Sequence, residues 1–211
     1  LAKDIGTVTD WPAVFADCEA RIKADPQDAV AYALRAECRA QHELVQADHR
    51  RAIELDPNRA WFHALAARVL VYKGQTDEAM REVEIAIALR PECGWFYSWR
   101  GEIHRRQASF KDAIADQSQA IALNDRDSRA YAWRGSLRGM LGDLKEARQD
   151  LDRSLELDTE YASWILSERR HVRWSLKDFD GAWEDLRQAA RRDPRHSFSK
   201  NAEGRKDFSW G

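Results

Sequence analysis

The chain has 211 residues, of which 44% are hydrophobic and 33% are charged, and its formal net charge is −2. This near-neutral balance excludes a general electrostatic attraction to nucleic acid or to an anionic membrane, and no apolar run approaches the roughly 18 residues that a membrane span needs. Cys18, Cys38 and Cys93 are far apart and match neither a disulfide framework nor a metal-ligand spacing. We therefore expect a reducing, cytoplasmic location and no bound metal.

The first expected element is a single helix at about residues 10–25, and an internal repeat then follows it. Residues 87–91 (Ile-Ala-Leu-Arg-Pro) match residues 53–57 (Ile-Glu-Leu-Asp-Pro) at an offset of 34. The same offset, with one extra residue at the last step, relates a column of alanines: Ala79, Ala113, Ala147 and Ala182. A fixed period of this length indicates a repeat protein.

Each period reads as two amphipathic helices joined by a tight turn. Gly74 and Gly142 mark two of these turns, because glycine tolerates a left-handed backbone. Pro57 and Pro91 mark the ends of second helices. The expected helix pairs span about residues 28–57, 58–91, 92–125, 126–159 and 160–194, followed by a polar tail over 195–211.

Three departures from the period stand out. The first pair is three residues short, so the turn near Gln41 is atypical. The last pair has one extra residue, and Lys177 replaces the turn glycine. Asp125 and Thr159 stand where two closing prolines are expected.

With its aromatic, glycine, alanine and proline positions in a period of 34, the sequence resembles the tetratricopeptide repeat family over about residues 10–194. The resemblance implies an all-α fold, namely a right-handed α-solenoid of about five helix pairs with a lone N-terminal helix and a C-terminal tail. Residues 1–211 would then form one superhelical domain. In this family the first helix of each pair lines a concave face, and the family implies a non-catalytic scaffold that binds protein or peptide partners.

Helical counting along the first helices predicts which side chains face the concave side, and six of the nine tryptophans fall there. A solvated stripe of tryptophan is costly unless a partner covers it, and tryptophan and arginine dominate binding energy at many interfaces. The alternative is that some rings pack against neighbouring helices. The predicted partner-binding residues are Trp61, Arg68, Tyr72, Trp95, Trp99, Glu102, Arg105, Arg106, Arg129, Trp133, Trp164, His171 and Trp174.

The residue types on this face predict the chemistry of the ligand. Tetratricopeptide domains that hold heat-shock C-terminal tails use lysine, asparagine and arginine at fixed concave positions, whereas residues such as Ala64, Arg68 and Trp99 occupy the matching positions here. The expected partner is therefore an extended or helical peptide with apolar and acidic side chains, and the arginines would hold its carboxylates. The oligomeric state is left open.

The sequence offers no catalytic constellation, and we expect neither enzymatic activity nor a cofactor. The six histidines form no ligand pair at helical spacing. Residues 124–128 (Asn-Asp-Arg-Asp-Ser) resemble a calcium loop only faintly, since the glycine and the closing glutamate are missing.

Two other functions stay open. The basic segments 168–173 and 187–206, with Trp164 and Trp174 nearby, would bind single-stranded RNA by stacking and phosphate contacts, although we do not expect nucleic acid to be the partner. The chain begins at Leu1 with half a repeat, which fits a regulatory or substrate-recruiting domain of a larger enzyme.

Overall fold

The computed structural model describes residues 10–38, 42–158 and 162–192, and the expected tail over 195–211 and the atypical turn near Gln41 lie outside them. Within these ranges the chain forms α-helices and no strand. The helices are α2 (Trp11–Ala24), α3 (Ala29–Cys38), α4 (His42–Leu55), α5 (Ala60–Tyr72), α6 (Thr76–Leu89), α7 (Gly94–Arg106), α8 (Phe110–Leu123), α9 (Ser128–Leu141), α10 (Leu144–Leu157), α11 (Ala162–Ser175) and α12 (Phe179–Arg192).

The predicted all-helical repeat fold is confirmed, and each of the five predicted pairs contains two helices. The chain divides into two compact units, Leu1–Gln107 and Ala108–Gly211, which are described separately. The division falls between α7 and α8, inside the third predicted pair. That both units form one superhelical domain stays a prediction.

The first unit contains α2 to α7, in which each helix packs against the next along the chain. At its start the Asp10 side chain accepts a hydrogen bond from the backbone N–H of Ala13 at 3.0 Å and so caps α2. The first helices α5 and α7 are also in direct contact. Their core contains Phe96 and Ile103 of α7, both fully buried, together with Val83 of α6.

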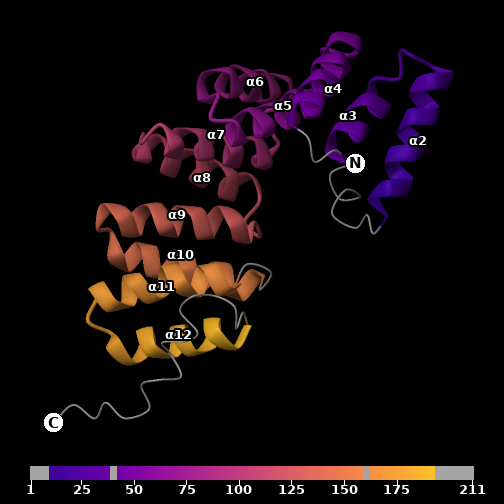
Figure 1. Cartoon of the computed structure of the whole chain (residues 1–211). Coiled ribbons are helices and arrows are strands. Elements are labelled where there is room, and N and C mark those ends of the chain that lie inside the picture. The colour runs from indigo at the N-terminus through magenta and orange to yellow at the C-terminus, as the bar shows by residue number, and fades with distance from the viewer. Residues whose placement is uncertain (1–9, 39–41, 159–161, 193–211) are drawn as a thin grey trace. The chain divides into compact units, whose positions relative to one another are not determined.

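The second unit contains α8 to α12. Here α9, α10, α11 and α12 follow one another as a stack (Figure 1), and α9 also touches α11. Leu151 of α10 and Ile165 and Val172 of α11 belong to one core cluster, so the fourth and fifth pairs share their hydrophobic interior.

The alanine column is buried on the second helices of the second to fifth pairs. Its members are 0–1% exposed: Ala79, Ala113, Ala147 and Ala182. In the fourth pair α9 and α10 approach closely at Gly135 of α9, because a Cβ there would lie 2.8 Å from Cγ of Leu151 and 3.0 Å from the carbonyl oxygen of Ala147. Small residues at this interface therefore set the distance between α9 and α10.

The turn between the helices of a pair requires a left-handed residue. Gly74 and Gly142 have φ angles of 77° and 91°, and the equivalent Ala108 and Lys177 adopt 59° and 63°. Left-handed backbone costs a residue with a Cβ roughly 1–2 kcal/mol. Lys177 therefore sits in the fold at a conformational cost that glycine avoids.

The contrast between glycine at position 142 and lysine at position 177 can be tested with two substitutions. We expect Gly142→Ala to lower the free energy of unfolding by about 1 kcal/mol, because the left-handed turn must persist. Lys177→Gly should leave it unchanged or raise it by up to about 1 kcal/mol, since relief of strain opposes the greater entropy of glycine in the unfolded chain. Urea titrations of both variants measure these changes, and equal losses in the two would contradict the account.

Candidate functional site

Aromatic rings on the first helices form a connected cluster in the first unit. The ring centroids of Trp61 on α5 and Trp95 on α7 are 5.1 Å apart, and those of Trp95 and Trp99 are 5.6 Å apart. Tyr72 meets the edge of Trp99 at 6.3 Å. The three tryptophans are half-buried against the core, whereas Tyr72 is 62% exposed. The structure thus brings these four predicted residues together, with Tyr72 the most accessible.

The charged residues predicted beside this cluster bind one another. Glu102 accepts hydrogen bonds from Nε of Arg105 at 2.7 Å and from Nε of Arg106 at 2.8 Å. Burial raises the pKa of Glu102, but the two guanidinium groups outweigh it and hold the pKa below its usual value. On the neighbouring first helices, Arg68 of α5 donates to the buried carboxylate of Glu37 of α3. All three arginines therefore already face carboxylates of their own chain.

In the second unit the first helices α9 and α11 meet through Trp133 and Trp164, whose ring centroids are 4.7 Å apart. Beside them, the hydroxyl of Ser136 donates a hydrogen bond of 2.7 Å to Glu168 of α11. Arg129 is exposed one helical turn before Trp133 and makes no ion pair with the residues that the structure describes. This unit therefore presents one predicted arginine that is available to a ligand.

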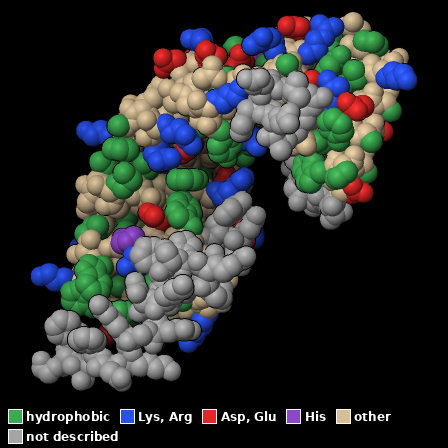
Figure 2. All heavy atoms as spheres, viewed as in Figure 1, with side chains coloured by type: hydrophobic (Ala, Val, Ile, Leu, Met, Phe, Trp, Pro, Cys, Tyr) green, Lys and Arg blue, Asp and Glu red, His purple; other side chains and the backbone are tan. Residues whose placement is uncertain are grey.

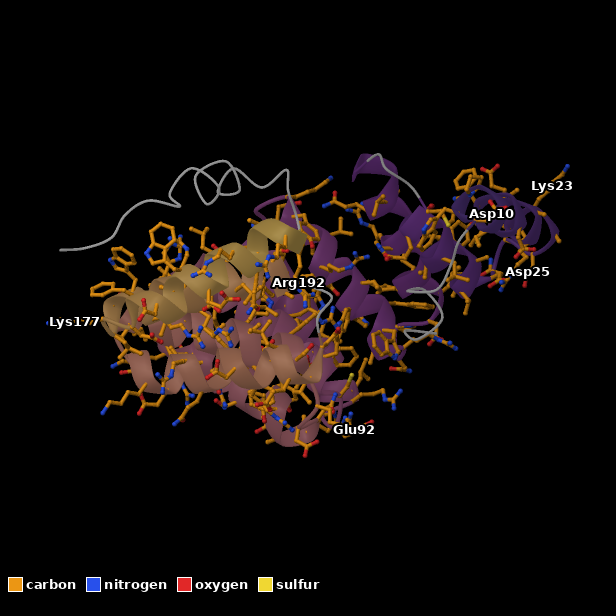
Figure 3. All side chains as sticks on the ribbon, turned by 90° about the horizontal axis from the view of Figure 1, so that it is seen from below. Asp10, Lys23, Asp25, Glu92, Lys177 and Arg192 are labelled. Carbon is orange, nitrogen blue, oxygen red and sulfur yellow. The ribbon has the colours of Figure 1, made fainter. Side chains whose placement is uncertain are left out.

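Two further predicted residues, His171 and Trp174, are exposed near the end of α11. Desolvation and the positive charge of Arg170 lower the pKa of His171. Trp174 is 53% exposed, and its ring packs edge-on against Phe179 of α12 with centroids 5.0 Å apart. These residues lie at the turn of the last pair, which Lys177 marks in Figure 3.

The sequence interpretation missed a buried arginine–aspartate pair that joins the two helices of a repeat. Asp150 of α10 is bound by Arg134 through two hydrogen bonds of 2.7 and 2.9 Å, and Arg138 adds a third at 2.7 Å. Asp185 of α12 is bound in the same way by Arg169 and Arg173 of α11. A constant offset of 16 residues was the signal that could have revealed these pairs.

The first pair of helices repeats this interaction at a shorter offset. Arg35 of α3 donates to Asp48 of α4 at 2.7 and 2.9 Å, and 13 residues separate them. The difference from 16 equals the three residues by which the first pair is short. The helix α3 is three residues shorter than α5, with 10 residues against 13, and the polar contact between the helices is retained.

Replacing Asp185 with alanine should destabilise the second unit strongly. The carboxylate is fully buried, and its loss removes an acceptor shared by two arginines. Because Arg169 keeps Asp152 and Arg173 keeps the carbonyl oxygen of Gly181, the expected cost is up to about 3–5 kcal/mol, the value for a broken buried pair. Glu184→Ala is the control, since the exposed pair between Glu184 and Arg187 contributes at most about 1 kcal/mol. Urea denaturation measures both, and a loss below about 1 kcal/mol for Asp185→Ala would argue against this role.

In the second pair Ala66 stands at the arginine position, and His63, three residues earlier, contacts Glu82 at the aspartate position. The Nδ1 atom of His63 lies 2.7 Å from Glu82 of α6, and Nε2 lies 2.9 Å from the backbone carbonyl of Pro57. Both ring nitrogens face acceptors, so the protonated ring satisfies both contacts. Burial lowers the pKa of His63, but these two hydrogen bonds outweigh it and raise the pKa above its ordinary value.

The raised pKa predicts how stability depends on pH. His63 stabilises the fold fully below its unfolded pKa of about 6.5, and this contribution is lost as the pH rises through the higher folded pKa, by at most about 1.4 kcal/mol per pH unit. The difference in the free energy of unfolding between the wild type and His63→Gln should therefore shrink from pH 5.5 to pH 9. His171→Gln should gain stability relative to the wild type as the pH falls, because the pKa of His171 is lowered. A pH-independent difference for His63→Gln would contradict the assignment.

In the described parts of the chain, no group of three histidine, cysteine, aspartate or glutamate side chains is arranged to hold a metal ion. None of the described helices is long and apolar enough to cross a membrane.

The sequence matches models of the tetratricopeptide repeat over residues 65–122, from the second half of α5 through α6 and α7 into α8, and over residues 128–161, which include α9 and α10. These two segments are tetratricopeptide repeats. They were thus correctly identified from the period of 34. Among curated proteins none gives a significant match to the sequence.

Solved structures of tetratricopeptide repeat proteins share the fold. YrrB, described as having an unusual peptide-binding site, is 24% identical, with 89% of this chain and 97% of YrrB covered at a TM-score of 0.63. PilW, a type IV pilus biogenesis factor, is 18% identical, with 92% and 91% covered at 0.83. PilF of Pseudomonas aeruginosa is 18% identical, with 90% and 87% covered at 0.76. These neighbours show the same fold, and the tetratricopeptide repeats themselves support a protein-interaction scaffold.

Proposed function

We propose that this chain is a non-catalytic scaffold that binds a peptide or protein segment along the first helices of its repeats. The ring cluster of Trp61, Trp95, Trp99 and Tyr72 is the observation that carries the proposal. Three of its rings are fixed by the core, so they offer a preorganised apolar surface, and binding then costs little side-chain entropy. Tyr72 supplies the accessible edge with a hydroxyl group.

The internal ion pairs restrict the kind of ligand that the first unit can bind. Because Arg68, Arg105 and Arg106 are neutralised by Glu37 and Glu102, an acidic ligand would have to compete with carboxylates that are already in place. An apolar or aromatic segment needs no such exchange. The second unit differs, since exposed Arg129 beside the Trp133–Trp164 pair suits a segment that carries an acidic residue next to a large apolar one.

RNA binding receives no comparable support. Arg169 and Arg173, two of the arginines in the basic segment, are committed to Asp185. On the face drawn in Figure 2, positive side chains are interspersed with hydrophobic and acidic ones and do not gather into one basic field. The same protein-binding role would serve a chain that acts alone or one that recruits substrates to a larger enzyme. A cytoplasmic location belongs to this proposal and rests on the three free cysteines.

A peptide selection on the full chain tests the proposal. Peptides enriched from a random library should contain aromatic or aliphatic residues, and Tyr72→Ala should raise their Kd by about tenfold or more, because it removes an exposed contact residue. The matched control is Arg153→Ala on the second helix α10, where an exposed arginine pairs with Glu156. Melting curves of both variants should overlay that of the wild type.

The variant Trp99→Ala tests whether this ring contributes to peptide binding or only to the stability of the fold. Because Trp99 packs partly against the core, we expect a lower melting temperature together with weaker binding per folded molecule. If melting collapses while the affinity per folded molecule holds, the ring is part of the core and the proposed binding face is wrong. Failure to enrich any peptide would also reject the proposal.

A further inference from the structure

The interface between the fourth and fifth repeats shows how one helix pair packs against the next. Leu144 and Leu151 of α10 pack in the same cluster as Ile165 and Val172 of α11. The approach to α9 is equally close, since a Cβ at Gly139 would lie 3.0 Å from Cγ2 of Val172. The incoming first helix thus covers a stripe on the preceding second helix and one position on the preceding first helix.

The last pair presents the same surface again. Phe179 and Leu186 of α12 stand at the positions of Leu144 and Leu151, and Trp174 of α11 stands at the position of Gly139. Leu151 is fully buried, whereas Leu186 is half-buried, Phe179 is 47% exposed and Trp174 is 53% exposed. In the part of the chain that the structure describes, α11 is the helix that packs against α12. We call Trp174, Phe179 and Leu186 the end face.

Continuity with the preceding interface identifies the kind of element that fits the end face, namely a helix in the place of a next first helix. Such helices carry apolar residues at two positions seven residues apart. These residues are 0–8% exposed in every repeat from the second to the fifth: Phe62 and Val69, Phe96 and Ile103, Ala130 and Leu137, and Ile165 and Val172.

The sequence that follows α12 does not supply this pattern. Phe62 and Phe96 lie five residues after the closing prolines Pro57 and Pro91, and the second apolar residue lies twelve after them. The same offsets from Pro194 reach Ser199 and Lys206, which are both polar. The chain also leaves α12 at Arg192, at the opposite end of that helix from Lys177 and the exposed rings (Figure 3).

A polar contact adds a second requirement. At the preceding interface Ser136 of α9 donates to Glu168 of α11, which lies between Ile165 and Val172 on the same helix. His171 occupies the position of Ser136 in the last pair and is exposed. A helix that carries glutamate at this position can accept a hydrogen bond from the imidazole.

We propose that the end face of the second unit binds an amphipathic helix from another protein, with apolar residues seven positions apart and an acidic residue between them. This interface uses His171 and Trp174, two of the predicted partner-binding residues of α11, and does not involve the ring cluster of Trp61, Trp95, Trp99 and Tyr72. The helix occupies the place on α12 that α11 takes on α10, but the ring of Trp174 at the position of Gly139 prevents the close approach seen there. The helix therefore packs on Trp174, Phe179 and Leu186, and its carboxylate meets His171. Its motif is apolar-x-x-acidic-x-x-x-apolar, as in Ile165, Glu168 and Val172.

The test uses the full chain and a fluorescein-labelled, lactam-bridged helical peptide with the sequence of Ala162–Ser175. Fluorescence anisotropy should show saturable binding. A control peptide with Ile165→Ser and Val172→Lys should fail to bind, because it carries the residues that the segment after Pro194 places at these positions. A second peptide with Glu168→Lys should bind several-fold more weakly.

Protein variants then locate the site. Trp174→Ala and Phe179→Ala should each raise the Kd of the peptide by about tenfold or more, since they truncate exposed rings at the centre of the interface. Tyr72→Ala, which removes an equally exposed ring of the first unit, should leave this Kd unchanged. The Tyr72→Ala variant therefore reports on the peptide surface of the first helices, and the Trp174→Ala variant reports on the end face.

Four outcomes would overturn the inference. The first is no binding of the α11 peptide, and the second is a Kd that is insensitive to both Trp174→Ala and Phe179→Ala. The third is a dimer of the wild type, seen by light scattering, that Trp174→Ala dissociates, because a second copy would then be the occupant. The fourth is a large gain in peptide affinity on deletion of residues 193–211, which would show that the chain covers its own end face.

Discussion

The close approach of the two helices within each repeat is the constraint on which the rest of the molecule depends. Buried alanines set this distance, for example Ala79 in the first unit and Ala147 in the second. An alanine brings the backbones together but removes little apolar surface from water. Further stability comes from the contacts around this approach. These are the arginine–aspartate pairs of the first, fourth and fifth helix pairs, the His63–Glu82 contact of the second, and the apolar residues shared with the next repeat.

The helix pairs and their turns could be predicted from the sequence, because repeated residues recur at a constant spacing. The period of 34 revealed the helix pairs, and the offsets of Gly74 and Gly142 revealed the turns, since both depend on local chain geometry. The extra residue of the last pair also indicated correctly that Lys177 takes the place of the turn glycine. The repeat period and the turn residues do not depend on how neighbouring helices pack, so they can be predicted from the sequence.

The candidate site was less predictable, because it depends on which side chains meet across neighbouring helices. Helical counting put Trp61 and Trp95 on one side of their helices, but the extent to which each ring sinks against the core depends on the partner helix. Helical counting also predicted that Arg68 would be available to a ligand, whereas Glu37 of another repeat neutralises its charge. No period in the sequence encodes that contact, since glutamate and arginine occupy it only once. The repeated offset of 16 between Arg134 and Asp150 was, by contrast, available to be read.

The pairing of Arg105 and Arg106 with Glu102 also has a kinetic consequence. A surface whose charges cancel within a few ångströms projects little field beyond one Debye length, about 8 Å at physiological ionic strength. A partner approaching the first unit then meets it by unsteered diffusion, at rates on the order of 10⁵–10⁶ M⁻¹s⁻¹ that change little with salt. If this face binds a partner as proposed, selectivity would come after encounter, through the lifetime of the complex and the fit of its rings.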